Sequence, residues 1–487
     1  MAPERKPGKV YLIGSGPGDP NLLTVKARTL LDEADVVAYD SLISPALLAS
    51  LSARSLNIPV GYRGYGSSKL SYGIHPTVIE MARKGKTVVR LKSGDPFIFG
   101  RGSQECSALN EEGILFEVVP GISSGLGAAI SAGFPLTHRD FSSNVVFASG
   151  HDLRGGSPCN SNWSSIAQTN GTVVIYMAAS KVKENCNRLI EFGKGEDTPA
   201  IFVASATCGD EEVVQGTLKD LGDLCKAIHP KKPAIIIIGE VVRTRELFNW
   251  RKDLPLNQKQ FLVLRQRNSE SEMAKILKSL GATVVEAPKF RSKIINPLPS
   301  ISKEGNYIIG QKESFTFFLQ HLMRSGKDIR ELLNARFFVM DEKTRCELNS
   351  FGIKEAALLK GHCHKAIVES DLPRDLIIVT RKEGRKSLQA DLEGLGHKVT
   401  RLEVYEREDI YLDIEAPRFD GVFCGSSSSI DSLTKSSWFE RCQNAPFFTI
   451  GKKTHDRALM NNLKCFMSDE DTLDSMVTLI LRKVRGV

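Results

Sequence analysis

One sequence pattern, or rhythm, recurs through the first half of the chain and limits the folds that this half can adopt. A short apolar run ends in a glycine-rich or polar turn, and a segment with helical spacing follows. The first case joins the apolar run 10–13, the loop 14–19, the helical pattern of residues 23–34 and a second apolar run at 35–39. Short apolar runs and three-to-four-residue spacing are typical of buried strands and amphipathic helices. The order predicts a strand–helix–strand unit and therefore an α/β fold.

The same rhythm predicts further strands and a division into domains. The strand candidates that follow are residues 87–91, 116–119, 144–148, 172–177, 200–204 and 234–238. Between about 245 and 259 the pattern lapses into a polar stretch with Pro255 and several charges, which indicates a linker. At 487 residues the chain is about three times a typical domain. We expect one domain over residues 1–245, a linker over 246–258 and a second domain over 259–487.

The second half contains an internal echo, that is, a set of segments with similar sequences that recur in the same order. Residues 334–344 match residues 444–454 at an offset of 110 positions. The segments 261–265 and 377–381 also resemble each other, because each precedes a helical pattern, a glycine and a valine-rich run. Elements that recur in the same order indicate repeated architecture, although amphipathic segments can match by chance. We expect two similar α/β lobes in this half.

The composition indicates which class of protein the chain belongs to and in which compartment of the cell we expect it. The chain is 41% hydrophobic and 25% charged, like an ordinary soluble protein. No apolar stretch approaches the roughly 18 residues of a membrane span, and residues 1–9 lack the apolar core of a signal peptide. Ten cysteines without a C-x-x-C pair indicate reduced thiols. We expect a cytoplasmic protein with no membrane partner and no metal site, and interpret the tract 362–364 (His-Cys-His) as a solvated loop.

The basic surplus lies in the second half. Residues 1–250 carry 26 basic and 25 acidic side chains, whereas residues 251–487 carry 39 and 32. Such a surplus favours a polyanionic partner, either nucleic acid or a small polycarboxylate, or else reflects only a soluble surface. Aromatic residues make up 7% of the chain and do not alternate with basic ones, which argues against nucleic acid. We expect no nucleic-acid partner, and RNA binding is the alternative.

Three motifs of the first half carry a family resemblance. The loop 14–19 fails the dinucleotide fingerprint because Asp19 stands at the third glycine position. Its companions are RLKSGDPFIFGRG at 90–102 and VPGISS at 119–124. With these motifs, residues 1–245 resemble the tetrapyrrole methylase family, closest to its uroporphyrinogen-III C-methyltransferases. The resemblance implies a two-lobed methylase fold and S-adenosylmethionine as cofactor, with the loops 14–19 and 93–101 meeting in one pocket.

The resemblance also implies which residues surround the cofactor. Matched position by position, they are Pro17, Ser93, Gly94, Asp95, Ile98, Ser123, Ser124, Met177 and Ala206. A sulfonium ligand with adenine and amino-acid ends needs backbone hydrogen bonds and apolar cover more than charged partners. Most of these residues follow predicted strands. For Met177, filling of the core is the alternative role.

The resemblance assigns catalysis to the stretch around Asp40. Asp40 matches the family's proton acceptor, which would remove the proton that the methylated pyrrole releases. Capping of the next helix is the competing role. The family's partner lysine is absent, and Tyr62 stands at its position, followed by Arg63. Tyr62 could replace the lysine as proton donor, and Arg63 could bind a substrate carboxylate through its planar fork.

Residues 259–487 resemble uroporphyrinogen-III synthases, with less specific motifs. The resemblance implies two α/β lobes with a cleft between them, in agreement with the echo. Tyr405 matches the family's acid candidate, and a buried strand residue is its alternative role. Ser426, Ser427 and Thr454 match positions that hold substrate carboxylates, although a serine run is also an ordinary turn. Residues 306–311, assigned to the first lobe, lack the family's Thr-Ser turn.

Together the resemblances imply a bifunctional enzyme, both transferase and lyase, of sirohaem and cobalamin synthesis. The second domain would cyclise hydroxymethylbilane to uroporphyrinogen III with inversion of ring D, mainly by positioning. The first would methylate that product at C2 and C7 to give precorrin-2. A homodimer through the methylase domain is also implied. The main alternative is a methyltransferase whose C-terminal half docks substrate without catalysis.

Overall fold

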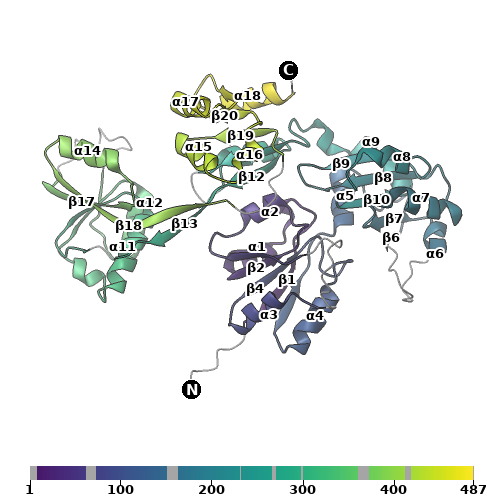
Figure 1. Ribbon diagram of the computed structural model, residues 1–487, viewed down its shortest axis with the longest axis horizontal. Helices are drawn as coiled ribbons and strands as arrows, with labels where there is room; N and C mark the ends of the chain where they lie inside the picture. The colour runs from purple at the N-terminus through teal and green to yellow at the C-terminus, as the bar shows by residue number, and fades with distance from the viewer. Residues whose placement is uncertain are drawn as a thin grey trace. The chain divides into compact units, whose positions relative to one another are not determined.

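The computed structural model describes residues 8–61, 73–150, 163–230, 232–265, 270–297, 300–359, 372–411 and 418–485. The chain forms two compact units, Met1–Lys289 with Tyr411–Val487, and Phe290–Ile410. Four sheets accompanied by helices lie within the described residues, three in the first unit and one in the second (Figure 1). The α/β class predicted from the sequence is confirmed.

The first sheet is parallel and contains the glycine-rich motifs at its carboxyl edge. Its strands lie in the order β3-β2-β4-β1-β5. They are β1 (Val10–Gly14), β2 (Val36–Tyr39), β3 (Leu56–Pro59), β4 (Val88–Lys92) and β5 (Phe116–Val119). The helices among them are α1 (Val25–Glu33), α2 (Pro45–Ser50), α3 (Pro76–Arg83) and α4 (Gly102–Glu111). In a parallel sheet all carboxyl ends meet at one edge, where ligands of α/β proteins bind.

The first sheet is held by apolar side chains from strands and helices. Ile13 and Val89 on the strands pack with Leu31 of α1 and Leu47 of α2, and all four are fully buried. Each such side chain contributes roughly 1.5–3 kcal/mol when it leaves water. The apolar runs of the sequence therefore became the central strands.

The second sheet is mostly antiparallel, in the order β6-β7-β10-β8-β9. Its strands are β6 (Val145–Ser149), β7 (Thr172–Tyr176), β8 (Pro199–Ala204), β9 (Glu212–Thr217) and β10 (Ala234–Ile238). Its helices are α5 (Ser124–Ala132), α6 (Trp163–Gln168), α7 (Val182–Glu191) and α8 (Leu221–Leu224). The expected polar linker contains the helix α9 (Arg245–Phe248) and the 3-10 turn Trp250–Asp253.

The third sheet is parallel and uses two distant parts of the chain, in the order β12-β11-β19-β20-β21. Its strands are β11 (Gln260–Leu264), β12 (Thr283–Ala287), β19 (Gly421–Cys424), β20 (Phe447–Thr449) and β21 (Cys465–Met467). Its helices are α10 (Glu272–Ser279), α15 (Ser427–Thr434), α16 (Phe439–Cys442), α17 (Lys452–Met460) and α18 (Leu473–Arg485).

The fourth sheet forms the second unit, in the order β13-β18-β17-β14-β15-β16. Its strands are β13 (Lys289–Ile294), β14 (Asn306–Ile309), β15 (Arg336–Val339), β16 (Ala357–Leu358), β17 (Asp375–Arg381) and β18 (Lys398–Ile410). Its helices include α11 (Lys312–Arg324), α12 (Glu342–Ser350) and α14 (Lys386–Gly394). The whole unit is inserted between β12 and β19.

The internal echo has a structural basis, but the lobes are not consecutive. Helices α12 and α17 begin at Glu342 and Lys452, which keeps the 110-residue offset, and each follows a short parallel strand. The assignment of residues 306–311 to a lobe that precedes the lobe of Tyr405 is wrong. Strand β14 pairs with β17, and β17 pairs with β18, which contains Tyr405. Both segments therefore belong to the inserted unit.

Candidate active site

Three loops meet at the carboxyl edge of the first sheet. Gly16 N donates to Gly94 O at 3.2 Å, and Gly94 N donates to Gly16 O at 2.9 Å. A Cβ atom on Gly14 would lie 2.5 Å from the nitrogen of Gly121, and one on Gly121 would lie 2.3 Å from Gly94 O. Such close approach of backbone to backbone requires glycine. The loops after β1, β4 and β5 therefore form one structure, as expected for the first two.

Side chains lock the loops after β4 and β5 together. Asp95 accepts hydrogen bonds from Phe97 N at 2.9 Å and from Gly121 N at 3.2 Å, one on each carboxylate oxygen. The Ser124 hydroxyl lies 3.1 Å from where a Gly94 Cβ would stand. Ser123 is buried, and its hydroxyl lies 2.7 Å from that of Tyr176. Gly94, Asp95, Ser123 and Ser124 are thus neighbours.

The second sheet contributes loops that face the glycine-rich loop. Pro17 packs on α5, where a Cβ on Gly127 would lie 2.5 Å from the proline ring. Asp19 N donates to the Thr207 hydroxyl at 3.1 Å. Ala206, just before Thr207, is buried, whereas Met177, at the end of β7, is 44% exposed. The exposure of Met177 argues against simple core filling and leaves its side chain available to a ligand.

Backbone strain gathers in these loops. Five non-glycine residues there have left-handed backbones with φ between 49° and 64°; they are Phe99, Arg101, Met177, Ser205 and Thr207. This conformation costs about 1–3 kcal/mol per residue and persists only where the surroundings impose it. The loops therefore have one imposed shape, which is what a preformed ligand site requires.

Apolar side chains are exposed beside the loops. Phe97, Ile98 and Phe99 are all exposed, although they follow directly on Asp95 and Pro96. The ring of Phe99 lies 4.9 Å from that of Tyr176. Exposed apolar groups around a polar centre mark ligand-binding surfaces. The arrangement suits a ligand with both a charged centre and large flat apolar parts.

Asp40 belongs to a buried cluster of four charges. Arg90 and Lys92 of β4 and Glu105 of α4 are at most 6% exposed, whereas the Asp40 side chain is 24% exposed. Arg90 Nη2 donates to Asp40 Oδ1 at 2.5 Å and to Glu105 at 2.9 Å. Lys92 Nζ lies 3.1 Å from Glu105 and 3.9 Å from Asp40. Two cations balance two carboxylates, so only Asp40 turns a charged group towards solvent.

The cluster shifts the pKa values of its two cations in opposite directions. Burial opposes the charge on Arg90, yet Asp40 and Glu105 raise its pKa above the ordinary value. Burial, followed by the repulsion from Arg90, lowers the pKa of Lys92. Sequence comparison by motif did not single out these partners. The sequence did contain a signal for the cluster. Arg90 and Lys92 are two residues apart in an otherwise apolar strand, and side chains at this spacing lie on the same face of a strand.

Asp40 does not cap the next helix. Ser44 is the N-cap of α2 and accepts from Leu47 N at 3.2 Å. A Cβ on Gly61 would lie 2.5 Å from Asp40 Cα, so the chain reaches Asp40 just before residue 62. Tyr62 and Arg63 lie outside the described residues, and their roles stay predictions.

The candidate carboxylate-binding residues lie at the carboxyl edge of the third sheet. Ser426 caps α15, accepting from Ser429 N at 3.3 Å, and Ser427 is the first residue of that helix. Thr454 is in the first turn of α17, and α15 packs beside α17. Helix N-termini present free N–H groups and partial positive charge, which favour anions. The two helix starts form one edge suited to carboxylates.

Tyr405 lies in the core of the second unit. Its side chain is 1% exposed and its ring stacks on Phe317, with the centroids 4.8 Å apart. Burial raises the pKa of Tyr405, with Glu313 acting in the same direction and a hydrogen bond with Ser314 opposing both. Of its two expected roles, this placement favours that of a buried strand residue.

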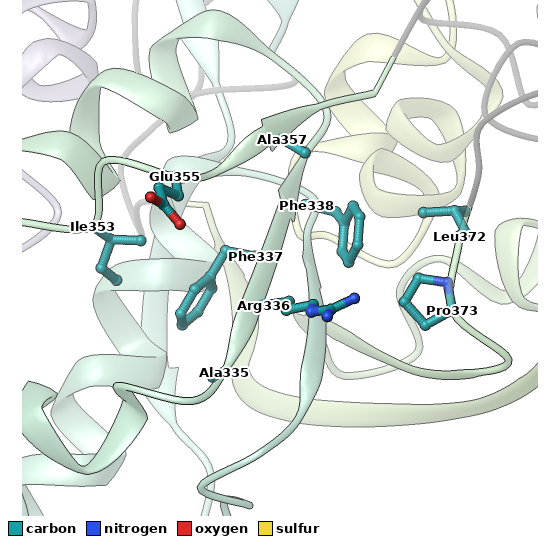
Figure 2. Close-up of a pocket in the computed structure, with 9 residues that line it drawn as sticks. All are labelled: Ala335, Arg336, Phe337, Phe338, Ile353, Glu355, Ala357, Leu372 and Pro373. Atoms are coloured by element: carbon teal, nitrogen blue, oxygen red, sulfur yellow. The ribbon is translucent and has the colours of Figure 1, made fainter.

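The second unit also has a surface hollow of about 480 Å³. It is lined by Ala335, Arg336, Phe337, Phe338, Ile353, Glu355, Ala357, Leu372 and Pro373. Figure 2 shows Phe337 and Ile353 on one side of β15 and Phe338 and Pro373 on the other, so the hollow straddles the sheet edge. Of the expected site residues that the structure describes, none lines it.

Membrane-spanning helices and clusters of metal-binding side chains are both absent from the described residues. Among them, no helix is both long and apolar enough to cross a membrane. Nor do three or more histidine, cysteine, aspartate or glutamate side chains gather as metal ligands in that part of the chain.

The fold and the loop cluster define a two-part α/β enzyme with a glycine-lined ligand site. Residues 9–222 match the family model "Tetrapyrrole (Corrin/Porphyrin) Methylases", and residues 271–478 match "Uroporphyrinogen-III synthase HemD". The chain is 34% identical to a uroporphyrinogen-III C-methyltransferase of Bacillus subtilis over 357 residues, 72% of this chain and 74% of that protein. It therefore belongs to the tetrapyrrole methylases, joined to a uroporphyrinogen-III synthase.

Two further relatives cover different parts of the chain. A porphyrin biosynthesis protein HemD of Ruminiclostridium josui is 28% identical over 505 residues, 97% of this chain and 98% of that protein. An S-adenosyl-L-methionine-dependent uroporphyrinogen III methyltransferase of Methanosarcina barkeri is 41% identical over 240 residues, 49% of this chain and 94% of that protein. The similarity thus extends over both halves.

Proposed function

We propose that the chain is a bifunctional enzyme of tetrapyrrole synthesis. The C-terminal half cyclises hydroxymethylbilane to uroporphyrinogen III with inversion of ring D. The N-terminal half methylates uroporphyrinogen III at C2 and C7 with S-adenosylmethionine and yields precorrin-2, which leads to sirohaem and cobalamin. The observation that supports this is the presence in one chain of two matched families, of which the second makes what the first methylates.

The loop cluster fits S-adenosylmethionine. When bound, this cofactor supplies an electrophilic methyl group on a sulfonium centre. We assign Gly94, Asp95 and Ser124 to its polar ends, where the Ser124 hydroxyl lies beside Gly94 and can offer a hydrogen bond. Met177 and Ile98 offer apolar cover on the exposed side. We assign the remaining contacts to the other residues that the family motifs mark, namely Pro17, Ser93, Ser123 and Ala206.

Asp40 is the proposed general base of methylation. Methyl transfer to a pyrrole carbon that already carries a side chain leaves that ring cationic. The tetrapyrrole becomes neutral again by losing a proton from another atom, and a positioned carboxylate can take that proton. Arg90 holds one carboxylate oxygen of Asp40, so the group keeps a fixed direction. Tyr62 as proton donor and Arg63 as a ligand of a substrate carboxylate remain proposals.

For the synthase half we propose that catalysis is mainly positioning. Ser426, Ser427 and Thr454 would hold substrate carboxylates at the two helix starts, whose first N–H groups favour anions. Loss of hydroxide from hydroxymethylbilane gives a stabilised cation, so folding the chain for closure is most of the task. The proposed extents of the two domains are residues 1–245 and 259–487.

Replacing Tyr405 with phenylalanine is expected to leave the kcat of cyclisation within about threefold of the original, well short of the 100-fold loss of a missing acid. The hydroxyl is buried beside Ser314, and its loss should cost about 1 kcal/mol of unfolding free energy. Coupled synthase assays and urea unfolding measure both effects. A 100-fold loss of kcat in a stable variant would restore the acid role.

We further propose a homodimer through the methylase domain, in the cytoplasm, with no nucleic-acid partner. Apolar side chains are exposed on α5 and on the segment packed against its end; they are Leu126, Ile130, Leu247, Phe248 and Trp250. The two elements are joined because Arg245 Nε donates to Ala132 O at 2.8 Å. An exposed apolar face of this kind suits a second copy of the same chain.

Ile130→Glu is therefore expected to halve the mass of the particle measured by light scattering, because a charge at the centre of the face would be buried unpaired. Leu333→Glu is the matched control, since Leu333 is equally apolar and 84% exposed in the second unit. An unchanged mass for the first variant, or a monomeric original protein, would contradict the dimer.

A one-pot assay from hydroxymethylbilane tests the whole function. Without S-adenosylmethionine the protein should give the type III isomer, and with it a product that carries two added methyl groups at C2 and C7. Uncatalysed closure gives the type I isomer. Type I product alone would favour a C-terminal half that only docks substrate.

A further inference from the structure

The linker after the first domain is tied to a buried side-chain cluster. Arg251 lies in the 3-10 turn Trp250–Asp253, and its side chain is 15% exposed. Its Nη1 donates to the Ser131 hydroxyl at 2.6 Å and lies 3.9 Å from the Glu211 carboxylate. The Ser131 hydroxyl donates in turn to Glu211. The cluster joins the linker, the end of α5 and the loop between β8 and β9.

Glu211 holds that loop in its strained shape. Glu211 Oε2 accepts from Thr207 N at 2.6 Å. Thr207 has a left-handed backbone, and so has Ser205, two residues earlier. A hydrogen bond from a backbone N–H to a buried carboxylate is stronger than one to a neutral acceptor. The Glu211 contact is therefore a direct reason why the loop keeps its shape.

The same loop forms one wall of the proposed cofactor site. Ala206 lies between the two strained residues, and the Thr207 hydroxyl accepts from Asp19 N of the glycine-rich loop. A Cβ on Gly18 would lie 2.4 Å from the sulfur of Cys208. A shift of the loop would therefore move both Ala206 and the glycine-rich loop.

The C-terminal half contacts the loop between β8 and β9 at a second point. Gln260, the first residue of β11, packs closely on Gly209. A Cβ atom on Gly209 would lie 2.1 Å from the side-chain oxygen of Gln260. Asp420, just before β19, accepts from Gln260 N at 2.8 Å and fixes its place. The loop is thus held from Arg251 on one side and from Gln260 on the other.

We propose that Arg251 is a positioning residue for S-adenosylmethionine, through Glu211 and Thr207. The assignment rests on the proposed methyltransferase function. A carboxylate as buried as that of Glu211 is costly without a cation, and Arg251 is the cation within 4 Å of it in the described chain. Without Arg251 the buried carboxylate loses its cationic partner, which favours its turning outward and so weakens its bond to Thr207. The linker is in this way part of the methylase.

The test uses the full chain in five forms: the original, Arg251→Ala, Arg251→Lys, Glu211→Gln and Lys252→Ala. Calorimetric titration with S-adenosylhomocysteine gives the dissociation constant and the number of sites per chain. Methylation kinetics give the KM for S-adenosylmethionine and kcat. Light scattering checks that each form keeps the mass of the original. Lys252 is the control because it is the exposed neighbour of Arg251 in the same turn.

Arg251→Ala and Glu211→Gln should each weaken binding about tenfold, the loss expected for a hydrogen bond to a charged group. The KM for S-adenosylmethionine should rise in step while kcat and the number of sites stay unchanged, and Lys252→Ala should match the original. Arg251→Lys should recover part of the affinity because it restores the charge without the planar fork.

Two results would overturn the positioning role of Arg251 and leave the proposed methyltransferase function standing. One is an Arg251→Ala variant that binds as tightly as the original. The other is a reduced number of sites with unchanged affinity, which would mean that Arg251 only keeps the protein folded. An original protein that binds no S-adenosylhomocysteine would instead overturn the proposed function and the assignment with it.

Discussion

Asp40→Asn is expected to lower the kcat of methylation by about 100-fold or more, with little change in cofactor affinity. Asparagine keeps the shape of the side chain but cannot accept the proton that the methylated tetrapyrrole releases. The carboxylate is the most exposed group of its charge cluster, so it alone can meet a substrate there. Radiolabelled methyl transfer to uroporphyrinogen III measures kcat, and calorimetry with S-adenosylhomocysteine measures affinity.

Asp32→Asn is the matched control for this change. Asp32 is an exposed carboxylate on α1 that pairs with Arg28, and its loss should leave kcat unaltered. If Asp40→Asn kept most of its kcat, the base would have to be another group and the charge cluster would be structural only.

Gly121→Ala is expected to weaken S-adenosylhomocysteine binding by up to about 100-fold, since overpacking costs about 1–3 kcal/mol. The new Cβ would stand 2.3 Å from Gly94 O and 2.7 Å from the carbonyl carbon of Gly14. Both neighbours are backbone and cannot rotate away, so the three loops must separate. Calorimetric titration measures the loss, and unfolding in urea measures how much stability goes with it.

Gly195→Ala controls for the added methyl group. The nearest atom to a Cβ on Gly195 is the Thr198 hydroxyl at 3.5 Å, which is ordinary contact. Tight binding by Gly121→Ala would mean that the loops yield without cost, and the glycine-lined site would lose its physical basis.

Apolar runs were enough to predict most strands of the methylase half, but not the edge strands β3 and β9. Residues 116–119 and 234–238 became β5 and β10 without change. Strand β10 is apolar over its whole length because it is a central strand and all of its residues are buried. The meeting of the loops 14–19 and 93–101 was implied by the family resemblance, and the parallel sheet explains it. In a parallel sheet, the segments after neighbouring strands have only one edge to share.

The partners of Asp40 could not be predicted in the same way. Glu105 is on a different element from Arg90, 15 residues later, and only the packing of α4 on β4 brings them together. Similarly, local pattern cannot reveal that β11 pairs with both β12 and the much later β19. Pairing between distant segments depends on the whole core rather than on either segment.

The insertion of the second unit has a consequence for biosynthesis of the protein. Gln260 is hydrogen-bonded to Asp420, 160 positions further on, and the neighbouring strands β11 and β19 pair along their length. A ribosome that has just finished the methylase half must still deliver the whole inserted unit before β11 can gain that neighbour. Contacts across so long a stretch are slow to form, and the waiting strand exposes an apolar edge. The synthase half is therefore expected to mature last and to depend most on chaperones during translation.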